Sequence, residues 1–277
     1  MSEQDRCHKT LSNSDGRGGR GEVLLTDDHK WKLIWHDEFD TELGDTPDPG
    51  RWGYDLGGHG WGNKELQVYT SLPENACIVV DADAAAGKAL AITAVHKPDG
   101  GYTSARLVTR NTFQSTYGRY EARIKVPSGQ GIWPAFWLLG GDMSEVGWPK
   151  CGEIDIMEWI GRVPGTAYGT LHGPGYSGKD GIQGKFPPVG EGLFSGEYHI
   201  FSVDWSPNLI VWHIDGVEYH KLTPADLPDG APWVYDHDHY MIVNLAVGGD
   251  WPGYPDDSTQ FPQSLNIDYV RVYQPSS

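Results

Sequence analysis

Basic side chains are scarce in this sequence: 21 Lys and Arg stand against 38 Asp and Glu, a formal net charge of −17 over 277 residues. Nucleic acids and anionic membrane surfaces both select a basic footprint, so neither is expected as a partner. No apolar run is long enough to span a bilayer. An acidic chain with 12 Trp and 14 Tyr is better suited to an uncharged ligand that stacks on aromatic rings.

Cysteine is also rare. Cys7, Cys77 and Cys151 are an odd number with no CxxC spacing, which excludes a disulfide framework and a typical zinc site. One pair could still form a bridge, and the spacing does not select which. The N-terminus lacks the charged-then-apolar layout of a secretory signal, so these features leave the compartment open.

Periodic apolar residues are missing from the first part of the chain. We interpret residues 1–29, which are polar and contain Gly and Ser, as a mostly disordered tail. The pattern changes at Trp31, and no second boundary follows. Residues 30–275 are therefore predicted to form a single domain.

Long amphipathic helices are absent from the pattern as well, and short β-type segments take their place. Residues 120–126 alternate apolar and charged side chains, which is typical of a half-buried strand. Asp215-Gly216 separates two alternating runs and predicts the type I′ turn of a hairpin. Residues 223–230 predict one short helical turn at most. Many antiparallel strands in one domain of this length predict an all-β sandwich of two large sheets.

The stretch "EIDIME" contains a conflict of side-chain direction. Glu153 and Asp155 share one face of a strand, whereas Glu158 would point to the opposite, apolar face. An unpaired ionised carboxylate in an apolar core costs several kcal/mol. A β-bulge at Ile156-Met157 would remove the conflict, because one extra residue resets the alternation and returns Glu158 to the face of the other two acids.

That arrangement predicts a catalytic role for the three acids. The two Glu backbones would lie about 13 Å apart, and inward-leaning side chains would bring the carboxyls to about 5 Å, the separation of a retaining glycosidase. One Glu would be ionised to attack an anomeric carbon, and the other would carry a proton for the leaving oxygen. Asp155 would orient both by hydrogen bonding. A solvated acidic strand is the alternative, and the flanking Ile, Met and Trp side chains disfavour it.

Sugar sites combine flat aromatic platforms with polar side chains. Four Trp lie beside Gly and Pro or beside the acidic strand and are candidate platforms: Trp133, Trp137, Trp148 and Trp251. Trp205 and Trp212 lie within alternating strands and are assigned to the core. The polar candidates for hydroxyl contacts are Asn63, Glu65, Arg106 and His172. His172 could equally be structural, and Arg106 could pair with a surface acid.

At these residues the sequence resembles glycoside hydrolase family 16, especially its laminarinase-like branch. The E-x-D-x-x-E signature of that family is matched by Glu153, Asp155 and Glu158. Further family-like segments span nearly all of residues 31–274: "WHDEF", "GNKELQVYT", "GRYEARIKVPSGQGIWPAFWLLG", "VDWSPNLIVWHIDG", "VNLAVGGDWPGYPD" and "IDYVRVY". Lys64 stands where the family commonly has Asn. The resemblance implies a jelly-roll sandwich with a concave glycan cleft, Glu153 as nucleophile, Glu158 as acid/base and Asp155 as the assisting acid.

The resemblance also implies a structural calcium on the convex side, held by Glu38, Gly87 and Asp268, mostly through backbone carbonyls. Calcium does prefer such oxygen ligands. The sequence contains no contiguous ligand loop, and Glu38 and Asp268 could equally be ordinary turn or surface acids. No cofactor is expected for the chemistry itself.

The expected function is therefore a retaining endo-β-1,3-glucanase that acts on laminarin-like glucans as a monomer. A mixed-linkage β-1,3-1,4-glucan or a marine galactan is the alternative substrate, and the acidic charge disfavours a sulfated polymer. A non-catalytic β-glucan recognition protein is the alternative of another class, which the presence of both Glu residues disfavours. Because the polymer does not cross membranes, a secreted protein is expected.

Overall fold

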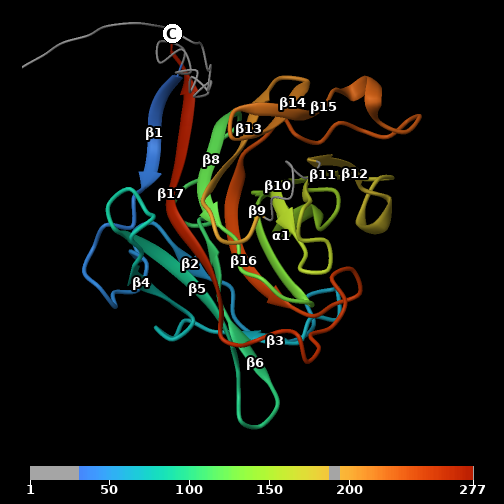
Figure 1. Cartoon of the computed structure of the whole chain (residues 1–277). Coiled ribbons are helices and arrows are strands. Elements are labelled where there is room, and N and C mark those ends of the chain that lie inside the picture. The colour runs from blue at the N-terminus through green and yellow to red at the C-terminus, as the bar shows by residue number, and fades with distance from the viewer. Residues whose placement is uncertain (1–30, 187–193, 277) are drawn as a thin grey trace, which may run out of the picture.

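Two stacked β-sheets form the molecule, as the alternating segments predict. The computed structural model describes residues 31–186 and 194–276 (Figure 1). The predicted tail, residues 1–29, lies outside them, as does Cys7. Cys77 and Cys151 are free thiols. In the described part of the chain, no helix is long and apolar enough to cross a membrane.

The larger sheet has ten strands among the described residues, in the order β15-β14-β13-β8-β17-β5-β6-β3, with β1 beside β17 and β4 beside β5. Its pairings are antiparallel except that β3 and β6 run parallel, which the sequence did not indicate. The strands are β1 (Trp31–Asp37), β3 (Gln67–Tyr69), β4 (Ala76–Val80), β5 (Lys88–His96), β6 (Tyr102–Ser104), β8 (Gly118–Lys125), β13 (His199–Ser206), β14 (Leu209–Ile214), β15 (Val217–Leu222) and β17 (Gln263–Pro275).

The smaller sheet has seven strands within the described ranges, in the order β12-β11-β10-β9-β16-β7-β2. All of its pairings are antiparallel. The strands are β2 (Gly53–Tyr54), β7 (Arg106–Val108), β9 (Ile132–Gly140), β10 (Glu153–Trp159), β11 (Ala167–His172), β12 (Ile182–Phe186) and β16 (His239–Val247). The acidic strand β10 therefore lies inside the sheet, between β9 and β11, and is not an edge strand.

Helical structure in the described residues is limited to short turns. These are α1 (Met143–Val146) and the 3-10 turns η1 (Gly178–Asp180) and η2 (Pro224–Asp226), of which η2 lies in the segment predicted to form one short turn. The predicted hairpin is also confirmed. β14 and β15 are joined by Asp215 and Gly216, whose φ angles of 51° and 77° suit a type I′ turn.

The hydrophobic core lies between the two sheets and follows from the period of two along each strand. In β8, Tyr120, Ala122 and Ile124 are fully buried, whereas the charged residues between them face outward. Trp205 and Trp212 are buried in the same core, as predicted. β9 and β10 contribute Phe136, Leu138, Ile154 and Ile156 from the smaller sheet. One face of β10 is thus committed to the core, which leaves the other face for polar groups.

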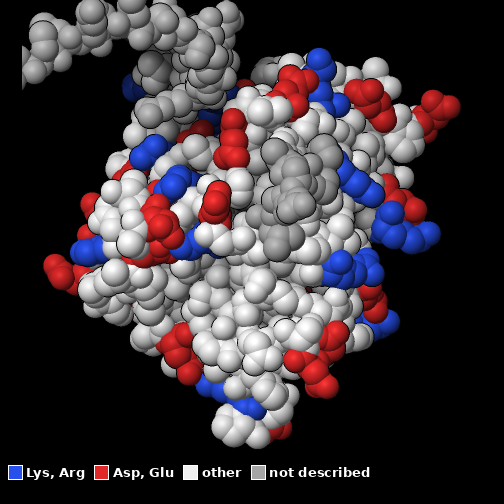
Figure 2. All heavy atoms as spheres, in the orientation of Figure 1, with Lys and Arg blue, Asp and Glu red and all other residues white. Residues whose placement is uncertain are grey.

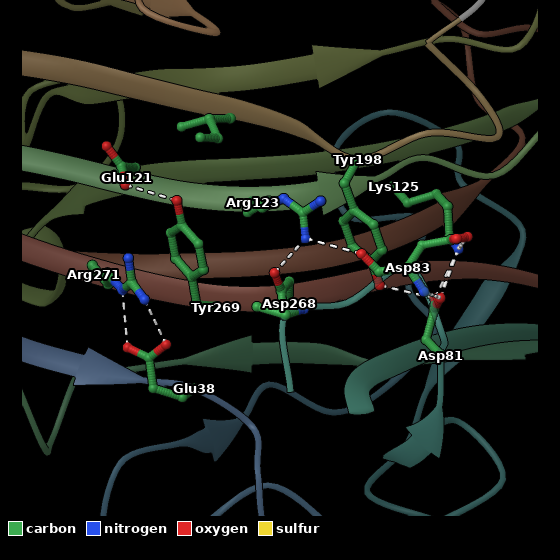
Figure 3. Close-up of polar contacts among 12 residues, drawn as sticks. Glu38, Asp81, Asp83, Glu121, Arg123, Lys125, Tyr198, Asp268, Tyr269 and Arg271 are labelled. Carbon is green, nitrogen blue, oxygen red and sulfur yellow. Dashed lines mark hydrogen bonds and ion pairs between the residues drawn. The ribbon is translucent and has the colours of Figure 1, made fainter. Parts of the chain in front are cut away.

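The outer face of the larger sheet carries a ladder of paired charges. Figure 3 shows β8 and β17 side by side, with Arg271 bonded to Glu38, Tyr269 to Glu121 and Arg123 to Asp268. Lys125 pairs with Asp81 and Asp83 at the end of this ladder. Acidic and basic side chains are likewise interspersed on the face in Figure 2. Many acids on these surfaces therefore lie next to a basic partner.

The core on the β9 side is expected to be sensitive to truncation. Phe136 is fully buried and pairs with Met157 of β10, so Phe136→Ala leaves a cavity beside the acidic strand. We expect the free energy of unfolding to fall by about 3–5 kcal/mol in urea titration. Val80→Ala, at a site that is 70% exposed, is the control and should change it by less than about 0.5 kcal/mol. A loss for Phe136→Ala no larger than the control's would contradict the packing described.

Candidate active site

A β-bulge in β10 brings the three acids to one face, as the sequence predicted. The register with β9 shifts between Asp155 and Met157, and the register with β11 shifts between Asp155 and Glu158. Ile154 remains fully buried behind the acids. Thr170 lies opposite Asp155 in β11, yet its hydroxyl donates a hydrogen bond to Glu158 at 3.1 Å. The side chains of Asp155, Thr170 and Glu158 therefore share one face of the sheet.

His172 lies among these carboxylates. Its Nε2 is 3.2 Å from Oδ2 of Asp155 and 3.7 Å from Oε1 of Glu153. Burial by itself would lower the pKa of His172, but the close contact of its Nε2 with the Asp155 carboxylate and the charges of all three carboxylates raise it to about 9. The imidazolium form partly compensates the negative charge of the group.

Glu153 is set up to ionise near neutral pH. Burial and the charge of Asp155 raise the pKa of Glu153 to about 7. His172 and a hydrogen bond from the indole of Trp148, at 2.9 Å from Oε2, act in the opposite direction. The donor keeps one oxygen of the carboxylate oriented, which suits an ionised group.

Glu158 is set up to hold a proton. Burial raises its pKa well above the ordinary value, and the neighbouring charges of Asp155 and Glu153 raise it further. His172 and the Thr170 hydroxyl oppose this only in part. Two carboxyl groups in one site thus have environments that suit different protonation states, which is the pattern of an acid and a nucleophile.

One group of three metal-ligating side chains occurs within residues 31–186 and 194–276. It consists of Glu153, Asp155 and His172, whose ligand atoms lie within 4.8 Å of one another. This group coincides with the acidic site itself. Hydrolysis by a pair of carboxyl groups needs no metal ion, so the arrangement is accounted for by the acids alone.

The residues predicted to hold calcium lie at the ladder on the larger sheet. Both carboxylate oxygens of Glu38 accept bonds from Arg271. Those of Asp268 accept bonds from Arg123 and from the backbone N–H of Ala85. The two carboxylates are thus already compensated by arginine and do not fit as free calcium ligands. The predicted contribution of backbone carbonyls is not tested by these contacts and stays a prediction.

The predicted aromatic platforms surround the acids. Trp133 and Trp137 are partly exposed on one face of β9, and Asp155 lies opposite Trp137. Trp251 packs edge-on against Trp133 at 5.4 Å between ring centroids. Trp148, which is 45% exposed, bonds directly to Glu153. The structure therefore brings the four Trp candidates to the neighbourhood of the acidic site.

Arg106 pairs with an acid, one of the two alternatives for this residue, and it does so within the site. Its Nε donates to Asp55 at 3.1 Å, and both side chains are 13% exposed. Its guanidinium lies 4.6 Å from the ring centroid of Trp61 and 4.7 Å from that of Trp137. The positive charge of Arg106 lowers the pKa of Glu153. The arginine is thus held rigidly between two indole rings on the same face as the acids.

Asn63 and Glu65 belong to a hydrogen-bonded network that reaches the same face. Glu65 accepts bonds from Asn63 at 3.0 Å and from Tyr69 at 3.4 Å. Asn244 of β16 donates to Tyr69 and accepts from the indole of Trp137. Burial raises the pKa of Glu65, and the donors around it act in the opposite direction. The network links the loop at Asn63 to the central strand β9.

Sequence reasoning missed several residues of this face. They are Asp55, Trp61, Tyr168, Thr170 and Asn244, which contact Arg106, Glu158, Trp251 or Trp137. Two carried a usable signal: Trp61 adjoins the Gly-rich loop of Asn63, and Asn244 interrupts the apolar run of β16. Asp55, Tyr168 and Thr170 carried none, because only the tertiary fold brings them next to their partners.

Comparison with known proteins gives a consistent result. The model of the family described as "Glycosyl hydrolases family 16" matches residues 61–271. A "Beta-glucanase" of Rhodothermus marinus is 42% identical over 255 residues, with 88% of this chain and 85% of that protein covered.

Solved structures agree in fold. The laminarinase catalytic domain of Thermotoga maritima has a TM-score of 0.80 and 46% identity, with 89% of this chain and 99% of that chain covered. The endo-β-1,3-glucanase of Pyrococcus furiosus has a TM-score of 0.80 and 44% identity, with 91% and 97% covered. The fold is therefore the predicted jelly-roll sandwich, and this chain belongs to glycosyl hydrolase family 16.

Proposed function

We propose that this glycoside hydrolase is a retaining endo-β-1,3-glucanase, with Glu153 as nucleophile, Glu158 as acid/base and Asp155 as the assisting acid. The observation that carries the proposal is the bulge in β10, which places both Glu side chains on one face while their surroundings favour different protonation states. The relatives named for activity on β-1,3-glucans support the choice of substrate.

In the first step, Glu153 attacks the anomeric carbon while Glu158 gives its proton to the leaving glycosidic oxygen. The bond from carbon to the leaving oxygen breaks, and a glycosyl ester forms on Glu153. The indole of Trp148 orients the attacking carboxylate, and His172 with Asp155 holds the charge balance around it.

In the second step, Glu158 accepts a proton from water, and the hydroxide attacks the same carbon and releases Glu153. Two displacements on one carbon retain the anomeric configuration. Both Glu residues end in their starting protonation states, so the site is ready for another cycle without a cofactor.

The surroundings suit an uncharged glucan. Sugar rings present apolar C–H faces to indole rings and hydroxyls to polar groups. Trp133, Trp137 and Trp251 supply rings, and the networks of Asn63 and Arg106 supply polar groups. Because Asp55 compensates the charge of Arg106, the site offers a sulfated polymer little free positive charge. A mixed-linkage β-1,3-1,4-glucan remains the alternative, since the same rings and donors would bind it.

Substitution of either Glu tests the catalytic roles. Glu153→Gln removes the nucleophile and Glu158→Gln removes the proton donor, so each should lower kcat on laminarin by at least about 100-fold in a reducing-sugar assay. Glu218→Gln, on the exposed part of β15, is the matched control and should retain activity. A wild-type protein that binds β-glucans without cleaving any of them would instead establish the recognition protein.

The stereochemistry follows from the same assignment. Proton NMR of the wild-type reaction should show the β-anomer of the product first, before mutarotation. Initial α-anomer would mean inversion, and the assignment of Glu153 as nucleophile would then be wrong.

The pH dependence of kcat/KM follows from the two shifted groups. Below about pH 7, Glu153 takes up a proton and loses its nucleophilic form, so kcat/KM should fall on the acidic side. On the alkaline side it should fall as Glu158 loses its proton, at a pH well above the ordinary carboxyl range. His172→Gln removes a positive charge that lowers the pKa of both acids, so both limbs should move to higher pH. If kcat/KM instead fell only near pH 4.5 on the acidic side, burial would not raise the pKa of Glu153, and the assignment would be contradicted.

A structural calcium bound by carbonyls of Glu38, Gly87 and Asp268 is retained as a proposal. If it binds there, EDTA should lower the melting temperature of the protein, and added calcium should restore it. An unchanged melting temperature would contradict the calcium site and would mean that arginine alone compensates the charge of Glu38 and Asp268.

We further propose that the protein acts outside the cell and as a monomer. A polymeric glucan does not cross membranes, so enzyme and substrate meet extracellularly. Activity confined to the cell lysate would count against the first point, and a dimer mass in light scattering would count against the second.

A further inference from the structure

One hydrogen-bond chain leads from exposed Gln183 to buried Glu158 and is not used in the mechanism above. Thr170 is 3% exposed, and its Oγ1 donates to Oε2 of Glu158 at 3.1 Å. The side-chain amide of Gln183 donates to the same Oγ1 at 3.4 Å. The chain crosses three adjacent strands, β12, β11 and β10.

The direction of this chain follows from the hydrogens that are available when Oε2 of Glu158 carries no proton. A hydroxyl has one hydrogen and two lone pairs, whereas the NH₂ of Gln can only donate and the unprotonated oxygen of a carboxyl group can only accept. Because the amide of Gln183 fills a lone pair on Thr170, the hydroxyl hydrogen is free to bond to Glu158. If the carbonyl oxygen of Gln183 faced Thr170 instead, Gln183 and Glu158 would both need the single hydroxyl hydrogen of Thr170.

The strand register explains why these residues meet. Thr170 lies opposite Asp155 on one side and opposite Gln183 on the other, so the three share a face. Without the bulge, Glu158 would point to the other face, out of reach of the Thr170 hydroxyl. The hydrogen bond thus depends on the irregularity that defines the acidic site.

We propose that Thr170, held by Gln183, is a positioning residue that occupies Oε2 of Glu158 and leaves Oε1 as the oxygen that carries and delivers the proton. The proposal rests on the acid/base role of Glu158. In the glycosylation step, the O–H bond at Oε1 breaks, the proton joins the leaving glycosidic oxygen, and the negative charge left on Glu158 is stabilised by the Thr170 hydroxyl.

The bond also affects the titration of Glu158. The groups that face this carboxyl are Asp155 and Glu153 from its own strand, His172 and Tyr168 from β11, and Tyr219 from β15. Asp155 and Glu153 raise the pKa of Glu158, whereas His172 and the Thr170 hydroxyl lower it. Loss of the hydroxyl alone leaves the other groups in place and should raise this pKa.

The test compares Thr170→Val, which replaces the hydroxyl with a methyl group of similar size, with Thr170→Ser, which keeps it. For Thr170→Val we expect kcat on laminarin to fall about tenfold with little change in KM, and the alkaline limb of kcat/KM to move to higher pH. Thr170→Ser should restore most of the rate and the wild-type limb. Gln183→Leu, which removes the support of Thr170, should have a smaller effect in the same direction.

A second substrate separates positioning from general damage. A β-laminaribioside of 2,4-dinitrophenol needs no protonation of its leaving group, so kcat/KM of Thr170→Val on it should be close to wild type. Equal losses on both substrates, or an unshifted alkaline limb, would overturn the proposal.

Thr109→Val is the matched structural control, because Thr109 is equally buried and its hydroxyl accepts a bond from the backbone of β16. It should lower the melting temperature without moving the pH profile. Should Thr170→Val fail to fold, Thr170→Ala removes the same hydroxyl and gives the same comparison with Thr170→Ser. A wild-type alkaline limb in Gln183→Leu overturns the supporting role of Gln183. Full activity of Glu158→Gln on laminarin would instead refute the proposed function itself, so the two failures are distinguishable.

Discussion

An ionised carboxylate that faces an apolar core without a partner costs several kcal/mol, and this cost explains how β10 is built. Ile154 and Ile156 must remain in the core, while Glu153, Asp155 and Glu158 must avoid it. One extra residue satisfies both demands, and the register with β9 and β11 shifts where it is inserted. The hydrogen bond from Thr170 to Glu158 and the closeness of Glu158 to the other two acids follow from this irregularity.

Burial then shifts the pKa values of the acids and so sets their protonation states. The acidic strand lies inside its sheet, and Asp155 and Glu158 are only 4% and 8% exposed. Desolvation and the charge of Asp155 raise the pKa of both Glu residues. His172 lowers the pKa of both, the indole of Trp148 lowers that of Glu153, and the Thr170 hydroxyl lowers that of Glu158. The difference between nucleophile and acid is thus produced by the surroundings of two chemically identical groups.

The outer face of the larger sheet also carries charged side chains, but these are paired at the surface and take no part in the acidic site. Its acids lie next to basic or hydroxyl donors, with Glu38 bonded to Arg271 and Asp268 to Arg123 (Figure 3). The same principle recurs on the site face, where Asp55 compensates Arg106 between two indole rings. Local pairing of this kind lets a chain with a net charge of −17 keep an uncharged-ligand site.

The sequence alone determined what depends on neighbours along the chain. Period-two alternation gave the strands, Asp215-Gly216 gave the hairpin, and the parity of the acids required the bulge, because each follows from local geometry. Tertiary structure decided the partners. Arg106 meets an aspartate 51 positions away, Asn244 meets Tyr69 at a separation of 175, and β3 pairs with β6 in parallel. Such contacts depend on how strands are ordered in the sheets, and strand order has no local signature in a single sequence.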